Sequence, residues 1–167
     1  MSDVHIRFAR PEDAETIHRL VAELAVYENL THEVVSTPDD LRRALAGPNP
    51  MIEVLLAENS GQAIGFALFF PTFSTFVGRP GLYLEDLFVL ADHRREGIGM
   101  ALLQELLRIA RERDYGRVEW TVLDWNEPAI QFYSEKLGAK ILPDWLRCRI
   151  SLQRAGTIRR APLSGGT

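Results

Sequence analysis

Residues 82–110 change from an apolar strand pattern to a basic loop with two glycines and then to a helical pattern. This order constrains the fold more than any other segment. The strand reads "LYLEDLFVL", and the helix begins at Gly97. Its apolar stripe recurs at helical spacing, at Ile98, Leu102, Leu106, Ile109 and Ala110. A second strand pattern follows at 117–123. A strand, a long helix and another strand in this order predict a parallel crossover.

The rest of the chain predicts further strands and shorter helices. The hairpin-type turn "NSGQ" (59–62) joins two of the strands, and Thr37-Pro38 is typical of a capped helix start. The expected elements, in chain order, are a strand at 4–10, helices at 11–28 and 38–47, strands at 52–58 and 63–71, a loop at 73–81, a helix at 128–137, and strands at 139–142 and 145–152. The fold class is therefore α/β: a mixed twisted sheet with antiparallel N-terminal strands, a parallel crossover and flanking helices.

Composition limits the class of protein. The 167 residues carry 46% hydrophobic and 25% charged residues with a net charge of −4, which argues against nucleic acid as a partner. We expect one domain over residues 1–154 and a disordered tail over 155–167. The single cysteine, Cys148, indicates a reducing compartment, and neither a signal peptide nor a membrane-spanning run is apparent, so a cytoplasmic protein is expected. The four histidines lack metal-ligand spacing, so no metal is expected.

The loop "RREGIG" (94–99) has the composition of an anion cradle. A helix start leaves amides that point at whatever precedes them, and glycines let a bulky anion approach the backbone. Two arginines add full charges. The loop is neither a Walker motif nor the three-glycine motif of dinucleotide binders. A capped helix start with two solvated arginines is the structural alternative.

Glu85 and Asp86 interrupt the apolar strand. Burying a charge without a partner is costly, so two adjacent acids in a core strand indicate a function. They could hold an ammonium group and accept its proton. Side chains of neighbouring strand residues point to opposite faces, so only a bulged strand would bring both to one pocket. The alternative is an internal salt bridge to Arg7 or Arg147.

The pattern R-x-x-G-x-G after a strand and at the start of a long helix resembles the acetyl-CoA signature of the GNAT N-acetyltransferase superfamily. The segments "LYLEDLFV" (82–89), "WNEPAIQFY" (125–133) and "ELAVYE" (23–28) resemble its diamine (spermidine/spermine) N-acetyltransferase branch. The resemblance runs from about Ile6 to about Leu152. It implies acetyl-CoA as co-substrate, a β-bulge in the 82–90 strand, direct acetyl transfer to a primary amine in a ternary complex, and a homodimer.

The resemblance also assigns residues to acetyl-CoA. The bulge would leave an amide near Leu87 or Phe88 to bind the thioester carbonyl, and Arg95 stands where many relatives have glycine. The full set is Leu87, Phe88, Val89, Arg94, Arg95, Glu96, Gly97, Ile98, Gly99, Met100, Asn126, Ala129 and Tyr133.

The catalytic residues implied by the resemblance are Tyr133, which protonates the departing thiolate, and Glu85, which accepts the amine proton. A core position beside Phe132 is the alternative for Tyr133. The expected substrate-binding residues are Tyr27, Glu28, Glu85, Asp86, Trp120 and Asp144. A small diamine or polyamine is the expected substrate. The alternative substrates are a lysine-like amino acid such as thialysine, an antibiotic, or a protein amine. The alternative function is that of a non-catalytic acyl-CoA sensor.

Overall fold

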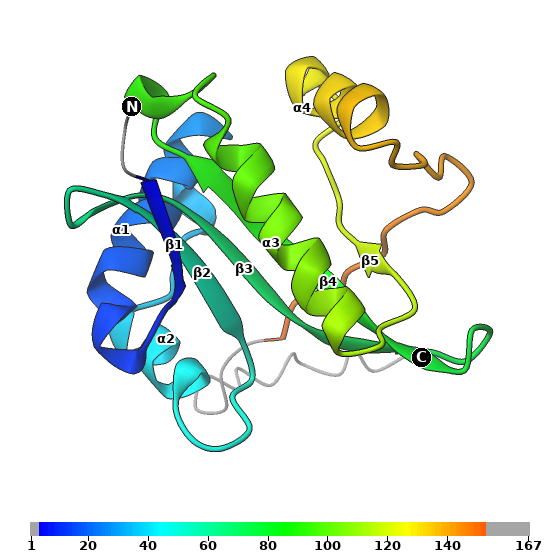
Figure 1. Ribbon diagram of the computed structural model, residues 1–167, viewed down its shortest axis with the longest axis horizontal. Helices are drawn as coiled ribbons and strands as arrows, with labels where there is room; N and C mark the ends of the chain where they lie inside the picture. Colours follow the sequence, from blue (N-terminus) through cyan, green and yellow to red (C-terminus); the bar gives the residue numbers. More distant parts are fainter. Residues whose placement is uncertain (1–3, 153–167) are drawn as a thin grey trace, which may run out of the picture. The chain divides into compact units, whose positions relative to one another are not determined.

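The computed structural model describes residues 4–152 of the chain, which fall into two compact units divided between Thr121 and Val122. The first unit contains the sheet and the three longest helices (Figure 1). The second contains α4 (Glu127–Gln131), which continues into a π-helical turn, Phe132–Lys136. Within residues 4–152, no helix combines the length and the apolarity that crossing a bilayer requires.

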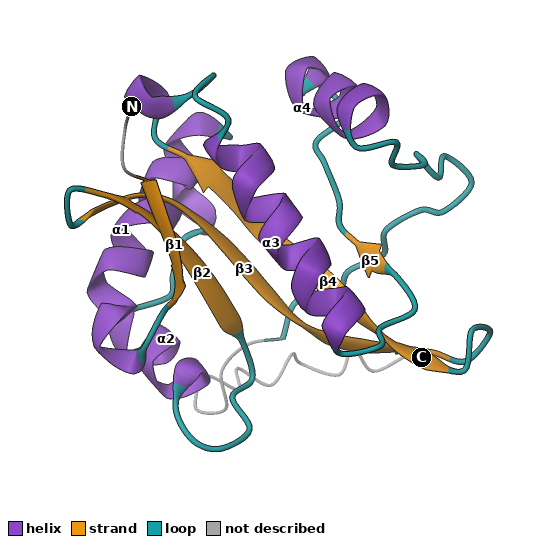
Figure 2. Cartoon of the chain, viewed as in Figure 1, coloured by secondary structure: helices purple, strands orange, loops and turns teal. Residues whose placement is uncertain are grey.

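The sheet has five strands in the order of the chain (Figure 2). The first four pair antiparallel, whereas the fifth pairs parallel with the fourth after the long helix. The strands are β1 (Val4–Phe8), β2 (Glu53–Asn59), β3 (Gln62–Ser74), β4 (Arg79–Val89) and β5 (Val118–Glu119). The predicted mixed sheet with one parallel crossover is therefore confirmed.

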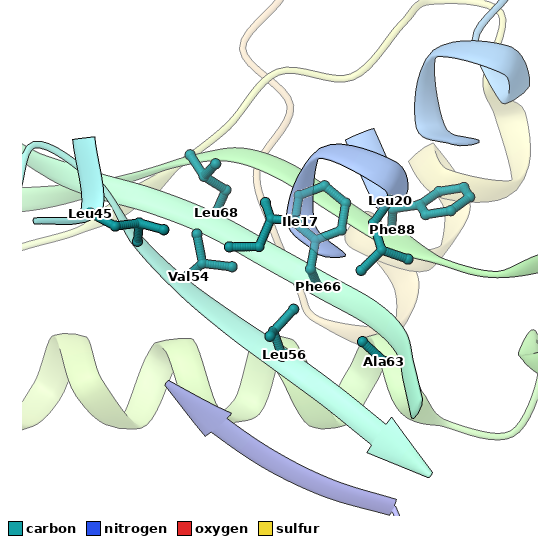
Figure 3. Packing of buried hydrophobic residues seen from close by; sticks show 9 residues of the cluster. All are labelled: Ile17, Leu20, Leu45, Val54, Leu56, Ala63, Phe66, Leu68 and Phe88. Atoms are coloured by element: carbon teal, nitrogen blue, oxygen red, sulfur yellow. The ribbon is translucent and has the colours of Figure 1, made fainter. Parts of the chain in front are cut away.

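Helices cover both faces of the sheet. On one face lie α1 (Ala14–Tyr27) and α2 (Pro38–Leu45), and on the other lies α3 (Ile98–Glu112) (Figure 1). Figure 3 shows the core on the α1 side, where helix residues meet side chains of β2, β3 and β4. Its buried members are Ile17, Leu20, Leu45, Val54, Leu56, Ala63, Phe66, Leu68 and Phe88.

Local signals placed several boundaries correctly. Thr37 caps α2: its hydroxyl accepts from the Asp40 amide at 3.3 Å, and the Asp40 carboxylate accepts from the Thr37 amide at 2.9 Å. The β2–β3 hairpin turns through Ser60 and Gly61, which have φ of +51° and +77°. Two consecutive positive φ angles suit the right-handed twist of the strands that this turn joins.

The predicted loop at 73–81 is wrong, because β3 and β4 continue as a long hairpin and turn only at 75–78. The turn is held by the Gly78 amide, which donates to the Ser74 carbonyl at 2.8 Å. Pro71 had indicated the end of a strand. However, its missing N–H lies on the β2 side, where the ladder already ends at Phe69, so no hydrogen bond is lost.

The predicted strands at 139–142 and 145–152 are also wrong. These residues form no strand, and their large apolar side chains are mostly exposed, as at Trp145, Leu146 and Ile150. The strand predicted at 117–123 is reduced to two residues. Alternation alone does not make a strand, because a strand also needs a ladder partner. The predicted disordered tail, 155–167, lies outside the described residues.

Candidate active site

A β-bulge lies in β4 at the two acidic residues. Leu84 pairs with Phe69 and Asp86 pairs with Leu68, the next residue along β3, so Glu85 has no residue opposite it. Two residues of one strand therefore occupy the space of one, which interrupts the regular alternation of side chains. The bulge implied by the family resemblance is present.

The bulge determines which face Asp86 occupies. From Asp86 to Val89 the pairing is regular, so Asp86 shares the face of Phe88, which belongs to the core on the α1 side. Tyr83 lies on that face as well, since its ring is 5.3 Å from that of Phe70, which packs against the same core. Glu85 occupies the extra position, and its side chain is exposed.

The negative charges of Glu85 and Glu28 both act on the carboxyl group of Asp86. The pKa of Asp86 is raised to about 7, mainly by burial and also by the negative charges of Glu85 and Glu28. Glu28 follows the last residue of α1, and burial raises its pKa too. Within the first unit, over residues 4–121, no hydrogen bond or ion pair is made to the Asp86 carboxylate. No cation of this part of the chain therefore balances a negative charge on Asp86.

The structural alternative of an ion pair with Arg7 is wrong. The Arg7 guanidinium donates to Asp13 at 2.8 Å and to Glu58 at 2.7 Å. These carboxylates come from the 3-10 turn just before α1 and from β2. Arg7 therefore stabilises the β1 edge of the sheet.

Relative to wild type, we expect Asp86→Asn to have a higher free energy of unfolding at pH 8 than it has at pH 4.5. The folded-state pKa of Asp86 is above its unfolded value of 3.8. Folding must therefore keep the carboxyl protonated or bury its charge as pH rises toward 7, and wild-type stability falls over that interval. The asparagine variant lacks this loss, so its advantage grows with pH by an amount on the order of 2 kcal/mol. Urea denaturation of both proteins at the two pH values measures it; a constant difference would contradict the burial of Asp86.

The bulge also reverses the direction of the backbone amides. The Leu82 amide donates toward β5, to the Arg117 carbonyl at 2.9 Å, whereas the Leu90 amide donates toward β3, to the Ile64 carbonyl at 2.9 Å. In a regular strand two residues an even number apart would donate to the same side. Beyond the bulge, the amides of Leu87 and Val89 therefore face the β5 side. The β4–β5 ladder ends at Tyr83, so these amides point to an edge with no neighbouring strand among residues 4–152.

The loop before α3 has the backbone of an anion site. Gly97 caps the helix at φ +81°, and a side chain there would meet no atom within 4 Å. The first amides of a 15-residue helix point toward this space. Arg95 has φ +67°, a conformation that glycine adopts without cost, so glycine would also suit this position. These are the features of an anion-binding loop at a helix start.

Arg94 is exposed, but its side chain folds back onto the protein. Its Nε donates to the Val89 carbonyl at 3.0 Å, and its guanidinium lies 4.4 Å from the ring centre of Tyr27 and 5.4 Å from that of Phe88. This places the loop's first arginine against the end of α1. The sequence had indicated only a phosphate contact, because stacking between distant residues leaves no local pattern.

The remaining predicted residues occupy several positions. Glu96 lies 3.7 Å from the His93 ring, Ile98 is buried, and Gly99 packs near Val89. Met100 is partly buried in the first turn of α3, and Trp120, partly buried, follows β5.

In the second unit, Asn126 is buried and caps α4, since its side chain accepts from the Ala129 amide at 3.4 Å. Tyr133 is buried in the π-helical turn, and its ring centre lies 5.5 Å from that of Phe132. Asp144 is exposed. Among residues 4–152 no group of three or more histidine, cysteine or acidic side chains is arranged to hold a metal ion.

The model of the acetyltransferase (GNAT) family matches residues 16–139, which include the bulged strand, the glycine loop and Tyr133. The chain belongs to the GNAT acetyltransferase family. This GNAT protein is therefore an acyltransferase, of a family whose members use acetyl-CoA as co-substrate.

Similar proteins support the predicted branch of the GNAT family. The chain is 32% identical to the L-ornithine N5-acetyltransferase of Arabidopsis thaliana, covering 87% of this chain and 83% of that one. It is 33% identical to the thialysine N-epsilon-acetyltransferase of Mus musculus, covering 89% and 93%. It is also 33% identical to the spermidine/spermine N(1)-acetyltransferase-like protein 1 of Homo sapiens, covering 81% of this chain and 20% of that one. The three names share an N-acetyltransferase activity.

Proposed function

We propose that this protein transfers the acetyl group of acetyl-CoA to a primary amine of a small cationic substrate, by direct attack in a ternary complex. The observation that carries the proposal is the acidic cluster of Glu28, Glu85 and Asp86 beside an anion cradle. The acidic cluster would attract a cationic amine. The anion cradle would bind the phosphates of a coenzyme A thioester. The names of the similar proteins, which cover ornithine, thialysine and spermidine or spermine, support an amine of this class.

The residues that would hold acetyl-CoA fit its chemistry. The glycine loop at 94–100 would bind the pyrophosphate through backbone amides. The amides of Leu87 and Val89 point to the edge of β4, where they would donate to the thioester carbonyl and stabilise its developing negative charge. When bound, acetyl-CoA supplies the acetyl group as a thioester. Asn126 and Ala129 are the proposed pantetheine contacts of the second unit.

Asp86 and Glu85 have different proposed roles toward the amine. Asp86, partly buried, holds the ammonium by a charge-assisted hydrogen bond, and a bound cation favours its ionised form. Glu85, exposed at the bulge, accepts the ammonium proton, directly or through water. The neutral nitrogen would form a bond to the acetyl carbon as the carbon–sulfur bond breaks, and it would then lose its second proton to water. Tyr133 would donate its proton to the departing sulfur, and the phenol would be restored from solvent. Tyr27, Trp120 and Asp144 are proposed substrate contacts.

A panel of amines tests the proposal. Release of free coenzyme A would be followed with putrescine, spermidine, spermine, ornithine, lysine and thialysine, and with a small protein as the macromolecular control. We expect turnover with at least one of the small amines and none with the protein. Acetyl-CoA binding without turnover on any amine would instead support the acyl-CoA sensor. The cytoplasmic location and the homodimer remain predictions, tested by fractionation and by light scattering.

We expect Glu85→Gln to lower kcat for the preferred amine by about 100-fold, the contribution of one positioned base. Amine binding should also weaken, because one carboxylate of the cluster is lost, and the pH dependence of the rate should change. Steady-state kinetics between pH 6 and 9 measure all three. Glu112→Gln, an exposed glutamate on α3, is the control. Unaltered kinetics and pH profile in Glu85→Gln would remove Glu85 from the mechanism.

A further inference from the structure

Arg94 joins two parts of the first unit that lie far apart in the sequence. It begins the loop that precedes α3, and its guanidinium lies over the ring of Tyr27, the last residue of α1. The next residue after Tyr27 is Glu28, a member of the acidic cluster. Arg94 therefore connects the proposed acetyl-CoA loop with the helix end that carries part of the proposed amine site.

The contacts of Arg94 hold it in one orientation. A guanidinium is planar and can stack on aromatic faces, here those of Tyr27 and Phe88. The hydrogen bond from Nε to the Val89 carbonyl fixes the arginine to the end of β4, on the strand that carries the bulge. Three elements thus meet at one side chain: the end of α1, the end of β4 and the loop.

The geometry points to Arg94 as a positioning residue that fixes the acetyl-CoA loop against the end of α1 and so couples binding of the two substrates. This inference rests on the proposed function. Its consequence is that Tyr27, which is outside the loop, contributes to acetyl-CoA affinity through Arg94. In this role the planar shape of Arg94 matters as well as its charge.

Two substitutions separate this role from a plain phosphate contact. Arg94→Lys keeps the positive charge but loses the planar group and the Nε donor. If Arg94 acts only by charge on the pyrophosphate, the lysine variant retains acetyl-CoA affinity and Arg94→Gln loses it. If Arg94 acts by stacking, both variants lose affinity alike, by about fivefold, the scale of a cation–π contact.

The experiment measures the dissociation constant of acetyl-CoA by calorimetry and the KM of the preferred amine. It covers Arg94→Lys, Arg94→Gln, Tyr27→Leu, Tyr27→Phe and the double variant Arg94→Lys/Tyr27→Leu. We expect Tyr27→Leu to weaken acetyl-CoA binding about fivefold, Tyr27→Phe to weaken it less because the ring remains, and the double variant to lose no more than either single one. Arg111→Lys, an exposed arginine of α3, is the matched control.

Two results would overturn the inference: full acetyl-CoA affinity in Tyr27→Leu, or additive losses in the double variant. Urea midpoints of the same five variants test the Arg94–Tyr27 contact without any ligand, and they should also be non-additive. The proposed function fails separately, when the wild-type protein acetylates no amine of the panel. In that case the urea midpoints still test whether Arg94 and Tyr27 interact, because non-additive midpoints would show the contact without any ligand.

Discussion

Tyr133→Phe is expected to lower kcat by at least about 100-fold while the dissociation constant of acetyl-CoA changes by less than about twofold. The variant removes a single hydroxyl from a side chain that is buried in the π-helical turn. The aromatic contact with Phe132 at 5.5 Å can remain, so the packing of the turn is kept. The loss should therefore appear in the chemical step, where a thiolate leaves without a proton donor.

A matched variant separates this effect from the general loss of a hydroxyl. Tyr115→Phe changes a partly buried tyrosine just after α3 that has no proposed role in catalysis, and it should leave kcat unchanged. Turnover would be measured by coenzyme A release with saturating amine. A Tyr133→Phe protein with wild-type kcat would return Tyr133 to the structural role that its position beside Phe132 also allows.

Asp86→Asn is expected to raise the KM of the amine by about 100-fold with a smaller change in kcat. The asparagine keeps the shape of the side chain but removes the negative charge that balances the ammonium. Losing one partner of a partly buried charge pair costs about 2–5 kcal/mol, and 100-fold corresponds to about 2.7 kcal/mol. Asp39→Asn, on the exposed face of α2, is the control and should leave KM unchanged.

The pH dependence of amine binding gives this prediction a second readout. Below pH 7 the Asp86 carboxyl of the free protein is mostly protonated and does not attract a cation. The KM of the amine should fall as pH rises toward about 7 and level off above it. In Asp86→Asn this slope should be absent. A wild-type KM that stays constant from pH 6 to 8 would contradict the assignment.

Much of the first unit could be predicted because local pattern and tertiary structure agree there. The stripe from Ile98 to Ala110 predicted a helix that packs on the sheet, and the order of strand, helix and strand predicted the parallel pair. Prediction failed where the outcome depended on a partner. Residues 139–152 alternate like strands yet have no ladder, and Pro71 lies at a position where its missing N–H costs nothing.

The candidate site divides in the same way. The residue types of the glycine loop and the two acids were visible in the sequence, because charge in an apolar strand and glycine at a helix start are local signals. Which acid lies on the α1 side was not visible, since that depends on where β3 and β4 change register. The stacking of Arg94 on Tyr27 joins residues 67 positions apart and leaves no trace in either segment.

The inserted residue in β4 makes the proposed chemistry separable from the scaffold. Leu84 and Asp86 already pair with adjacent residues of β3, Phe69 and Leu68, so deleting Glu85 would leave a regular strand with every remaining side chain on its present face. Leu82 and Leu84, now 1% and 2% exposed, would stay buried. A lineage can therefore silence this chemistry by losing a single residue while it keeps the fold.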